Sequence, residues 1–455
     1  MTLIESARSG PTASWLAERI PGRSALEIGA GIEALIRDGD LGEGAQLPTI
    51  RELARALDLS VGTILIAWGR LRELGLIETH RRGGTVVRSV SKRPSAFRGW
   101  HELDFTGVAP DISLQPDLSR AVLDSLGVSD LNAWGRDYMT ERLLGAVEKE
   151  WPFEAEAWAT AGGGTEALLL ATAAAAPPGS VIAVDEPVSP GLLDTLRDLE
   201  LTAVGVAADE EGPTVESLRA ALAKRPKAFV FQPGAAFAAR PPASARRIRE
   251  LADVIRAHDE KITIVEDDAI GPLAEQTPLT LGTELPGQVI RVRSYCKAYG
   301  IDVRTSVIGG SRELVERSIQ LRSHGVGSNS RILQNTLAYL IRSEAANSDV
   351  ALARETYAAR KQLLVAALGA RGITVHTGPD SIVLWIEVAD ETETILRLAS
   401  RGIAVGSGSR SFVAPLNQQL IRVSPMQLPD SPELVEQFAE ILADATSRAG
   451  REFFE

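Results

Sequence analysis

Lys297 is the residue whose type and position most directly suggest chemistry. It ends the segment Ser294-Tyr295-Cys296-Lys297, which follows an apolar run, and Arg304 comes seven residues later. The chain has only seven lysines among its 48 Lys and Arg residues, so a lysine after a buried strand is a notable use of a scarce residue. A lysine amine can form a Schiff base with a carbonyl compound. The segment therefore indicates a covalent site for a carbonyl cofactor.

Two further segments carry groups that a charged cofactor would need. Val265-Glu266-Asp267-Asp268 places carboxylates at the end of an apolar strand, and Ala161-Gly162-Gly163-Gly164-Thr165 opens an apolar helix. Glycines at a helix N-terminus let backbone N–H groups reach a phosphate. Each segment also has a purely structural interpretation, as a helix cap for the carboxylates or as a tight turn for the glycines.

Arg422 lies in a third apolar run, Leu420-Ile421-Arg422-Val423-Ser424, near the C-terminus. A guanidinium can bind a carboxylate through two parallel hydrogen bonds, which suits an arginine to ligand recognition. A surface ion pair is the alternative interpretation of the same residue.

These residues need a sheet to position them, and the chain beyond residue 104 supplies its pattern. Short apolar runs alternate with helical patterns, as expected of an α/β body with a largely parallel sheet. Ligands bind such sheets at the carboxyl ends of the strands. The predicted strands are Val181–Val184, Ala228–Phe231, Ile262–Val265 and Val289–Val292.

The first 90 residues have a different pattern, that of a helix-turn-helix followed by a β-hairpin. A helix is expected around Leu26–Ile36, and Thr49 with Glu52 forms a capping box for a second helix. Ser60 is the predicted cap of a third helix, which stops at Gly75. The hairpin that follows, from Leu76 to Val87, carries Arg81 and Arg82 near its tip.

The N-terminal part and the rest of the chain differ in net charge. The whole chain has a net charge of −12, but residues 46–100 contain ten basic and four acidic side chains, a net of +6 that leaves −18 for the rest. A basic module joined to an acidic body favours double-stranded DNA as a partner of the first part. A solvated basic face, or a helical protein–protein module, is the alternative.

Taken together, the chain resembles the MocR-like subgroup of GntR transcription regulators. These join a GntR-type winged helix to a fold-type I aminotransferase-like domain that binds pyridoxal phosphate. The resemblance implies an α/β fold class with a winged helix-turn-helix at residues 24–88, a linker at 89–103 and an aminotransferase-like effector domain at 104–445. The small C-terminal α+β subdomain is expected at about 345–445.

The resemblance also implies roles for individual residues. Lys297 would hold pyridoxal phosphate as a Schiff base, Asp267 would pair with its pyridine nitrogen, and Arg422 would bind a ligand carboxylate. The phosphate would be held by Gly164, Thr165, Ser294 and Arg304. A departure from the GntR pattern is Val61-Gly62 where an arginine often follows the capping serine. The residues expected to contact DNA are Arg51, Arg55, Ser60, Thr63, Arg70, Arg81 and Arg82.

Several positions depart from the pattern of a working transaminase. Ser189 stands where an aromatic residue is usual. Ala235, Ala269 and Ile270 stand where residues usually donate hydrogen bonds to the cofactor hydroxyl. Trp134 stands near the place of a tyrosine that often reaches the phosphate bound by the partner subunit. Lost catalytic groups commonly lower a rate by about 10²- to 10⁴-fold each. The sequence therefore favours a pyridoxal phosphate-binding regulator that senses the cofactor or a small amine or amino acid. An active aminotransferase with a DNA-binding appendage, and a sensor that has lost pyridoxal phosphate, are the alternatives.

The remaining expectations concern compartment and assembly. The chain lacks an N-terminal signal pattern and any run of about 18 apolar residues, so a cytoplasmic protein with no membrane partner is expected. Its single cysteine, Cys296, excludes an internal disulfide. We also expect a homodimer, and no metal site.

Overall fold

The structure is a computed structural model, and the chain divides into two compact units, Met1–Gly99 and Trp100–Glu455. The structure describes residues 12–20, 22–37, 40–41, 44–73, 76–80, 84–87, 103–129, 131–132, 138–322 and 329–446.

The N-terminal unit is a helical cluster with a small sheet. Its elements are α1 (Ala13–Arg19), α2 (Ala25–Arg37), β1 (Gln46–Leu47), α3 (Ile50–Leu57), α4 (Val61–Glu73), β2 (Ile77–His80) and β3 (Gly84–Val87). β2 and β3 form the expected antiparallel hairpin, and β1 pairs with the other side of β3. Leu53, Ile64, Trp68 and Leu71 are fully buried in its core. Helix α1, which the sequence analysis did not predict, packs on α3 and buries Leu16.

Local hydrogen bonds explain why α3 and α4 start where they do. The capping box is confirmed, because the Thr49 amide donates to the Glu52 carboxylate at 2.8 Å and the Glu52 amide donates back to the Thr49 hydroxyl at 3.3 Å. Asp58 then adopts a left-handed conformation with φ of 53°, which turns the chain sharply between the helices. The Ser60 hydroxyl accepts from the Thr63 amide at 3.0 Å and caps α4. This is a helix-turn-helix.

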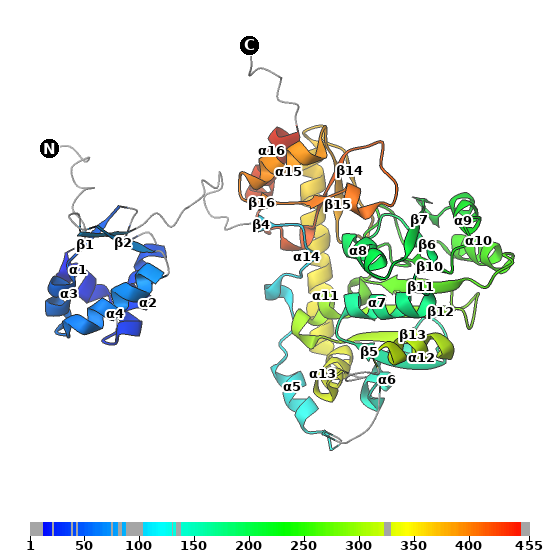
Figure 1. Cartoon of the computed structure of the whole chain (residues 1–455), viewed down its shortest axis with the longest axis horizontal. Coiled ribbons are helices and arrows are strands. Elements are labelled where there is room, and N and C mark those ends of the chain that lie inside the picture. Colours follow the sequence, from blue (N-terminus) through cyan, green and yellow to red (C-terminus); the bar gives the residue numbers. More distant parts are fainter. Residues whose placement is uncertain are drawn as a thin grey trace, which may run out of the picture. The chain divides into compact units, whose positions relative to one another are not determined.

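The larger unit is built on a seven-stranded sheet in the order β5-β13-β12-β11-β10-β6-β7 (Figure 1). Four predicted strands are present, as β6 (Val181–Asp185), β10 (Ala228–Phe231), β11 (Thr263–Asp268) and β12 (Val289–Ser294). They run parallel to β7 (Thr202–Val206), whereas β13 (Ser306–Gly310) is antiparallel to both β12 and β5 (Ala157–Ala161). The α/β fold class is thus confirmed, with one strand reversed.

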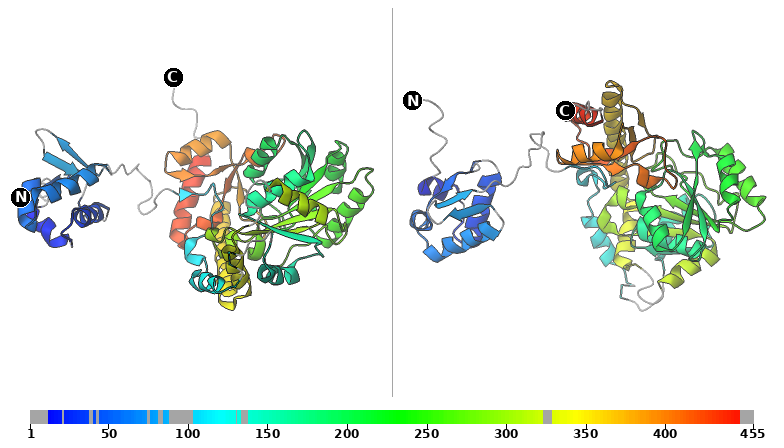
Figure 2. Two further views of the ribbon diagram at one scale, coloured as in Figure 1. Left: turned by 60° about the horizontal axis from the view of Figure 1, so that its bottom comes forward. Right: turned by 45° about the horizontal axis from the view of Figure 1, so that its top comes forward.

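Helices cover both faces of this sheet (Figure 2). Side chains alternate along each strand, so Ala228 and Val230 of β10 pack with α7 (Gly164–Ala175), α8 (Pro190–Asp198) and α12 (Arg312–Leu321). Phe229 and Phe231 of the same strand pack on the other face, against α9 (Val215–Leu222) and α10 (Ala245–Arg256). A strand buried on both faces explains the continuous apolar runs in the sequence.

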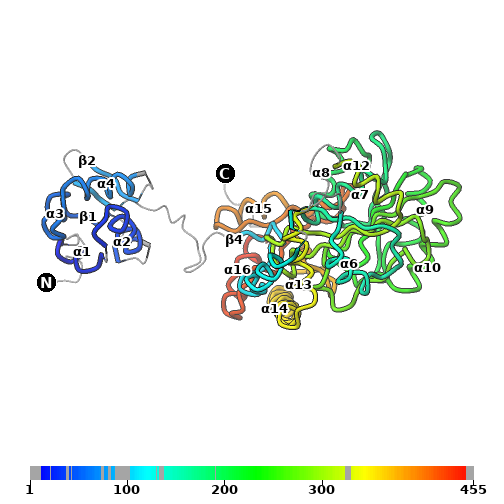
Figure 3. The backbone as a smooth tube through the Cα atoms, turned by 90° about the horizontal axis from the view of Figure 1, so that it is seen from below, coloured from blue at the N-terminus to red at the C-terminus, as the bar shows by residue number. Residues whose placement is uncertain are grey.

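The C-terminal part forms a second, smaller sheet in the order β14-β15-β18-β17. The long helix α14 (Glu344–Gly369) contacts α13 (Arg331–Arg342) and α16 (Pro432–Thr446), as Figure 3 shows. The other elements here are β14 (Val375–His376), β15 (Leu384–Glu387), α15 (Glu391–Ala399), β16 (Ile403–Ala404), β17 (Gly406–Ser407) and β18 (Leu420–Val423). β16 pairs in parallel with β4 (Leu103–Asp104), which ties the start of the unit to its C-terminal part.

The remaining short elements connect these layers. They are η1 (Ile112–Leu114), α5 (Ser119–Leu126), α6 (Glu141–Val147), η2 (Glu148–Glu150), β8 (Ala208–Asp209), β9 (Gly212–Pro213), η3 (Gly271–Leu273), α11 (Cys296–Tyr299), η4 (Ile301–Val303), η5 (Ser409–Ser411) and η6 (Pro425–Gln427).

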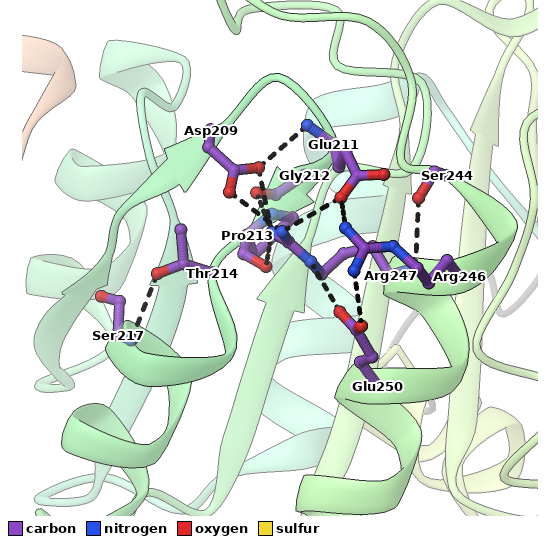
Figure 4. A network of polar contacts seen from close by, with 10 residues as sticks. All are labelled: Asp209, Glu211, Gly212, Pro213, Thr214, Ser217, Ser244, Arg246, Arg247 and Glu250. Carbon is purple, nitrogen blue, oxygen red and sulfur yellow. Dashed lines mark hydrogen bonds and ion pairs between the residues drawn. The ribbon is translucent and has the colours of Figure 1, made fainter.

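A buried arginine on α10 holds the hairpin of β8 and β9 (Figure 4). Arg247 donates to both oxygens of the Asp209 carboxylate and to the carbonyls of Gly212 and Pro213, all at 2.8 to 3.0 Å. Because one guanidinium satisfies two carbonyls and a carboxylate, this edge of the unit is fixed by charge-assisted hydrogen bonds.

Candidate functional site

A cavity of about 330 Å³ lies at the carboxyl ends of β11 and β12. Six residues predicted to contact the cofactor or its ligand line it: Gly164, Thr165, Asp267, Ser294, Lys297 and Arg422. A larger hollow of about 770 Å³ between α9 and α10 is lined by none of them. The position agrees with the rule that open α/β sheets bind ligands beyond the carboxyl ends of their strands.

Lys297 enters this cavity from the one-turn helix α11, which directly follows β12. Its side chain is buried, and its Nζ donates to the backbone carbonyl of Ala269 at 3.0 Å. The amine therefore has a fixed place opposite the end of β11. A lysine held in this way has the position required for a covalent bond to a carbonyl group in the cavity.

Asp267 is the carboxylate that reaches the cavity from β11. Burial raises its pKa to about 6, although the positive charge of Lys297 opposes that shift. Its neighbour Asp268 points into a buried ion pair, accepting from Arg291 at 2.8 Å. Burial would raise the pKa of Asp268, but Arg291 and then Arg293 lower it below the ordinary value. The two adjacent carboxylates of β11 thus have different surroundings: Asp267 lines the cavity and Asp268 forms a buried ion pair.

The N-terminus of α7 supplies an anion site on the same cavity. Gly163, with φ of 142°, precedes the helix, and no side-chain hydrogen bond caps the helix among the residues that the structure describes. Gly164 and Thr165 line the cavity, and a Cβ at Gly164 would lie 3.1 Å from the Ser294 hydroxyl. Unpaired N–H groups and the helix dipole favour a bound phosphate at such a place. The structure therefore brings three of the four predicted phosphate ligands together.

Arg304 is the fourth, and it does not line the cavity. It is exposed, has left-handed backbone with φ of 44° at the end of η4, and is not among the residues that line the cavity. Its carbonyl accepts from the Asn329 side chain at 3.1 Å. A phosphate contact from Arg304 stays a prediction.

Arg422 reaches the cavity from β18, in the smaller sheet. Its Nη2 donates to the Thr106 carbonyl at 2.9 Å, while its Nε is buried without a hydrogen-bond partner among the described residues. Burial, and then the charge of Arg410, lower its pKa. A Cβ at position 406 would lie 2.8 Å from Nε, so glycine there leaves room for the guanidinium. A buried cation with unused donors fits a carboxylate ligand.

The positions that depart from the transaminase pattern divide between the cavity and the core. Ser189 and Ala269 line the cavity, whereas Ala235 and Ile270 are buried and do not. Trp134 lies outside the described residues. Phe237, which the sequence analysis did not select, lines the cavity from the segment that contains Ala235. The side chain of Ala269 therefore offers the cavity no hydrogen-bond donor, as expected, and Phe237 adds an aromatic ring to its lining.

Thr106 and Gly107 also line the cavity and were not predicted. They follow the proposed linker in a stretch without apolar periodicity. Their place depends on a contact with Arg422, which is more than three hundred residues away in the chain. No local pattern could have identified them.

In the N-terminal unit, the residues expected to contact DNA lie mainly on the outside. Arg51 and Arg55 on α3 are exposed, as are Ser60 and Arg70, and Thr63 is half-buried. The Thr63 hydroxyl lies 2.8 Å from the Ser60 hydroxyl. Arg81 and Arg82 lie outside the described residues. The helix-turn-helix thus presents separate arginines at its surface.

The raised pKa of Asp267 predicts how stability changes with pH when no ligand is bound. Its folded pKa, about 6, lies above its ordinary 3.8, so ionisation weakens folding as pH rises from about 4 to 6 and the penalty persists above. Asp267→Asn should therefore increase the free energy of unfolding at pH 8 by up to about 3 kcal/mol, and by about half as much at pH 5. Denaturant titrations at the two pH values measure this.

Asp268→Asn is the matched control for that measurement. Because the pKa of Asp268 is lowered, its charged form stabilises the fold, and the substitution should destabilise the protein at pH 8. An equal gain from Asp267→Asn at both pH values would show that its ionisation does not oppose folding.

Fold and site together define the class, and the family comparison agrees. Residues 136–438 match the model of aminotransferase class I and II, and residues 24–87 match that of the bacterial regulatory proteins of the gntR family. The chain belongs to aminotransferase class I and II and carries a GntR-type DNA-binding domain in front. It is 28% identical over 430 residues to the vitamin B6 salvage pathway transcriptional repressor PtsJ of Salmonella typhimurium, covering 90% of this chain and 96% of that protein.

A further relative matches most of the chain, and solved structures share the fold of its larger unit. The uncharacterized HTH-type transcriptional regulator YjiR of Escherichia coli is 24% identical over 429 residues, covering 82% of this chain and 88% of that protein. A mutant aspartate aminotransferase of Thermus thermophilus superposes with a TM-score of 0.64 at 21% identity, over 79% of this chain and all of that one. An archaeal alanine:glyoxylate aminotransferase gives 0.68 at 18% identity, over 76% and 91%.

These findings confirm the predicted class, a GntR-type transcription regulator with an aminotransferase-like domain, whose cofactor class is pyridoxal phosphate. Within the described part of the chain, every helix is too short or too polar to span a bilayer.

Proposed function

We propose that this protein regulates transcription by binding operator DNA and that its larger unit senses pyridoxal phosphate, or an amine that reacts with it. The observation that carries the proposal is the single cavity lined by Lys297, Asp267, the N-terminus of α7 and Arg422. A cofactor with an aldehyde, a ring nitrogen and a phosphate has three groups to satisfy, and the cavity offers a partner for each.

The residues present fit the cofactor on structural grounds. The uncapped N-terminus of α7 and the Ser294 hydroxyl form an anion site, and Gly164 keeps them close together. The Lys297 amine would bond to the aldehyde, and Asp267 would hold a proton on the ring nitrogen. Pyridoxal phosphate supplies an electron sink for amino acid chemistry when it is bound. The name of the relative PtsJ refers to vitamin B6 salvage, which supports a ligand of this class.

Arg422 suggests which amines the site would accept. Its buried Nε lacks a partner in the described residues, and the guanidinium borders the same cavity as Lys297. An amine that carries a carboxylate would satisfy this arginine while its nitrogen displaces Lys297 from the cofactor. Amino acids are therefore the ligand class that we propose.

We further propose that the protein acts as a homodimer in the cytoplasm. Large apolar side chains are exposed on the larger unit, among them Ile112 at 89% and Ile301 at 60% exposure. Their segments meet, because the Gln115 amide approaches the Lys297 carbonyl at 3.5 Å. Burying such residues between two copies would remove apolar surface from water.

An active aminotransferase is the second candidate function, favoured by the retention of Lys297, Asp267 and Arg422 around one cavity. One preparation can separate the two. Amino acids are screened for a change in the visible spectrum of the protein with pyridoxal phosphate, and product is followed over many turnovers. We expect spectral changes with turnover at least 10²-fold slower than ordinary aminotransferases, because Ala269 and Ser189 remove donor and stacking contacts. Rapid multiple turnover would establish the enzyme instead.

A further inference from the structure

The outward face of α4, the second helix of the helix-turn-helix, is apolar. Val61 and Leu65 are each 50% exposed and Ile66 is 66% exposed, while Ile64, Ala67, Trp68 and Leu71 of the same helix are buried. Val61 and Leu65 are one turn apart and share a side of the helix, since an α-helix has about 3.6 residues per turn. Large apolar side chains on a solvent face contribute nothing to the core that α4 already has.

Two glycines, Gly62 and Gly69, lie on the same outward face, and packing within the unit does not explain why these positions are glycine. Glycine is the poorest helix former after proline. A Cβ at Gly69 would meet nothing within 4 Å, and one at Gly62 would meet only the Ser60 hydroxyl at 3.6 Å. Packing inside the protein therefore does not require either glycine. A partner that approaches the helix closely would explain both.

Hydrogen-bonding side chains are scarce on this part of α4. The stretch from Val61 to Gly69 contains no Arg, Lys, Asn, Gln, Asp or Glu. Its one hydroxyl, on Thr63, lies 2.8 Å from that of Ser60 in the helix cap. The bidentate pairs that usually read guanine and adenine in the major groove need Arg, Lys, Asn or Gln. This stretch cannot make them.

Exposed arginines on α3 and α4 identify the partner of the apolar face. Arg51 and Arg55 on α3, and Arg70 and Arg72 at the end of α4, are exposed. Arginines around a helix-turn-helix contact phosphates and bring the second helix into the major groove. Among the base edges there, the C5-methyl group of thymine is the apolar feature. Charge complementarity thus favours DNA as the partner of this face, and the apolar side chains favour thymine among the bases.

We propose that Val61 and Leu65 read thymine methyl groups in the operator and so determine its sequence at these contacts. The glycines let the helix sit deep enough for the side chains to touch the methyls. A G·C pair at the same place would lose water from its polar groups without gaining a partner, so the face discriminates in favour of A·T pairs. This inference rests on the proposed binding of operator DNA.

The test begins with a selection of bound sequences from a random duplex library by the full-length protein. We expect A·T pairs at the contacts of α4. Each selected thymine is then replaced by deoxyuridine, which removes only the methyl group. Affinity should fall about fourfold for each methyl in contact, as expected for one buried methyl group. Unchanged affinity for every deoxyuridine duplex, or G·C pairs at these positions, would overturn the proposal.

Variants assign the effect to α4. Leu65→Ala and Val61→Ala should bind thymine and deoxyuridine duplexes equally at the affected position, because the side chain that contacts the methyl is gone. Leu26→Ala is the matched control, since Leu26 is 61% exposed on α2 of the same unit. It should keep the full deoxyuridine effect. If the protein selects a sequence but shows no methyl effect, only this inference fails; if it selects no sequence, the proposed DNA binding fails with it.

Discussion

Lys297→Ala should abolish covalent attachment of pyridoxal phosphate. In the wild-type protein, borohydride reduction should leave the cofactor permanently bonded, as seen by mass, and the variant should show no adduct. The fold should survive, because within the described part of the chain the Lys297 amine makes one hydrogen bond, to the Ala269 carbonyl at 3.0 Å. Loss of a single such bond costs about 1 kcal/mol.

A second buried lysine provides the control for that experiment. Lys361 donates to the carbonyls of Gly378 and Pro379 at 2.7 and 2.6 Å and does not line the cavity. Lys361→Arg keeps the positive charge and should leave the covalent adduct intact. An adduct that persists in Lys297→Ala would show that another amine bonds the cofactor.

Replacing four arginines of the DNA-binding domain by glutamine should reduce DNA affinity at least about 100-fold near 0.1 M salt, because each lost phosphate contact removes counterion release. The four are Arg51, Arg55, Arg81 and Arg82. The slope of log affinity against log salt should become less steep by up to about 3.6 for each protomer. Fluorescence anisotropy over a salt series measures both quantities.

A variant with the same change in net charge separates local contacts from overall charge. Four exposed arginines of the larger unit, each in a surface ion pair, serve this purpose: Arg197, Arg246, Arg256 and Arg317. Their replacement by glutamine should leave the salt slope unchanged. Equal losses in the two variants would place the DNA surface elsewhere.

Local patterns predicted much of the fold where a segment determines its own structure. The capping box of Thr49 and Glu52 is a short-range feature, and strands such as β10 are apolar on both faces. β5 and β13 escaped prediction because they consist largely of small residues, Ala157–Ala161 and Ser306–Gly310. Their pairing depends on the rest of the sheet.

The residues of the candidate site also divide into those that a local pattern predicts and those that it does not. Asp267 and Lys297 were predictable, because each follows an apolar run and parallel strands bring their carboxyl ends to one edge. Thr106 lines the cavity through a contact with Arg422 on a distant strand, and Arg304 is not among the lining residues although it follows Lys297 by only seven positions. Both depend on tertiary structure that no local pattern encodes.

One titration tests most directly whether the state of the cavity changes DNA binding. Operator affinity is measured at one salt concentration for the full-length protein without ligand, with pyridoxal phosphate, and with the cofactor plus any amino acid that changes its spectrum. Coupling between two sites is typically about 1 to 3 kcal/mol, so we expect affinity to change about 5- to 150-fold in the wild-type protein. Lys297→Ala should lose this response while still binding DNA. Identical affinity under all three conditions would contradict the sensor account.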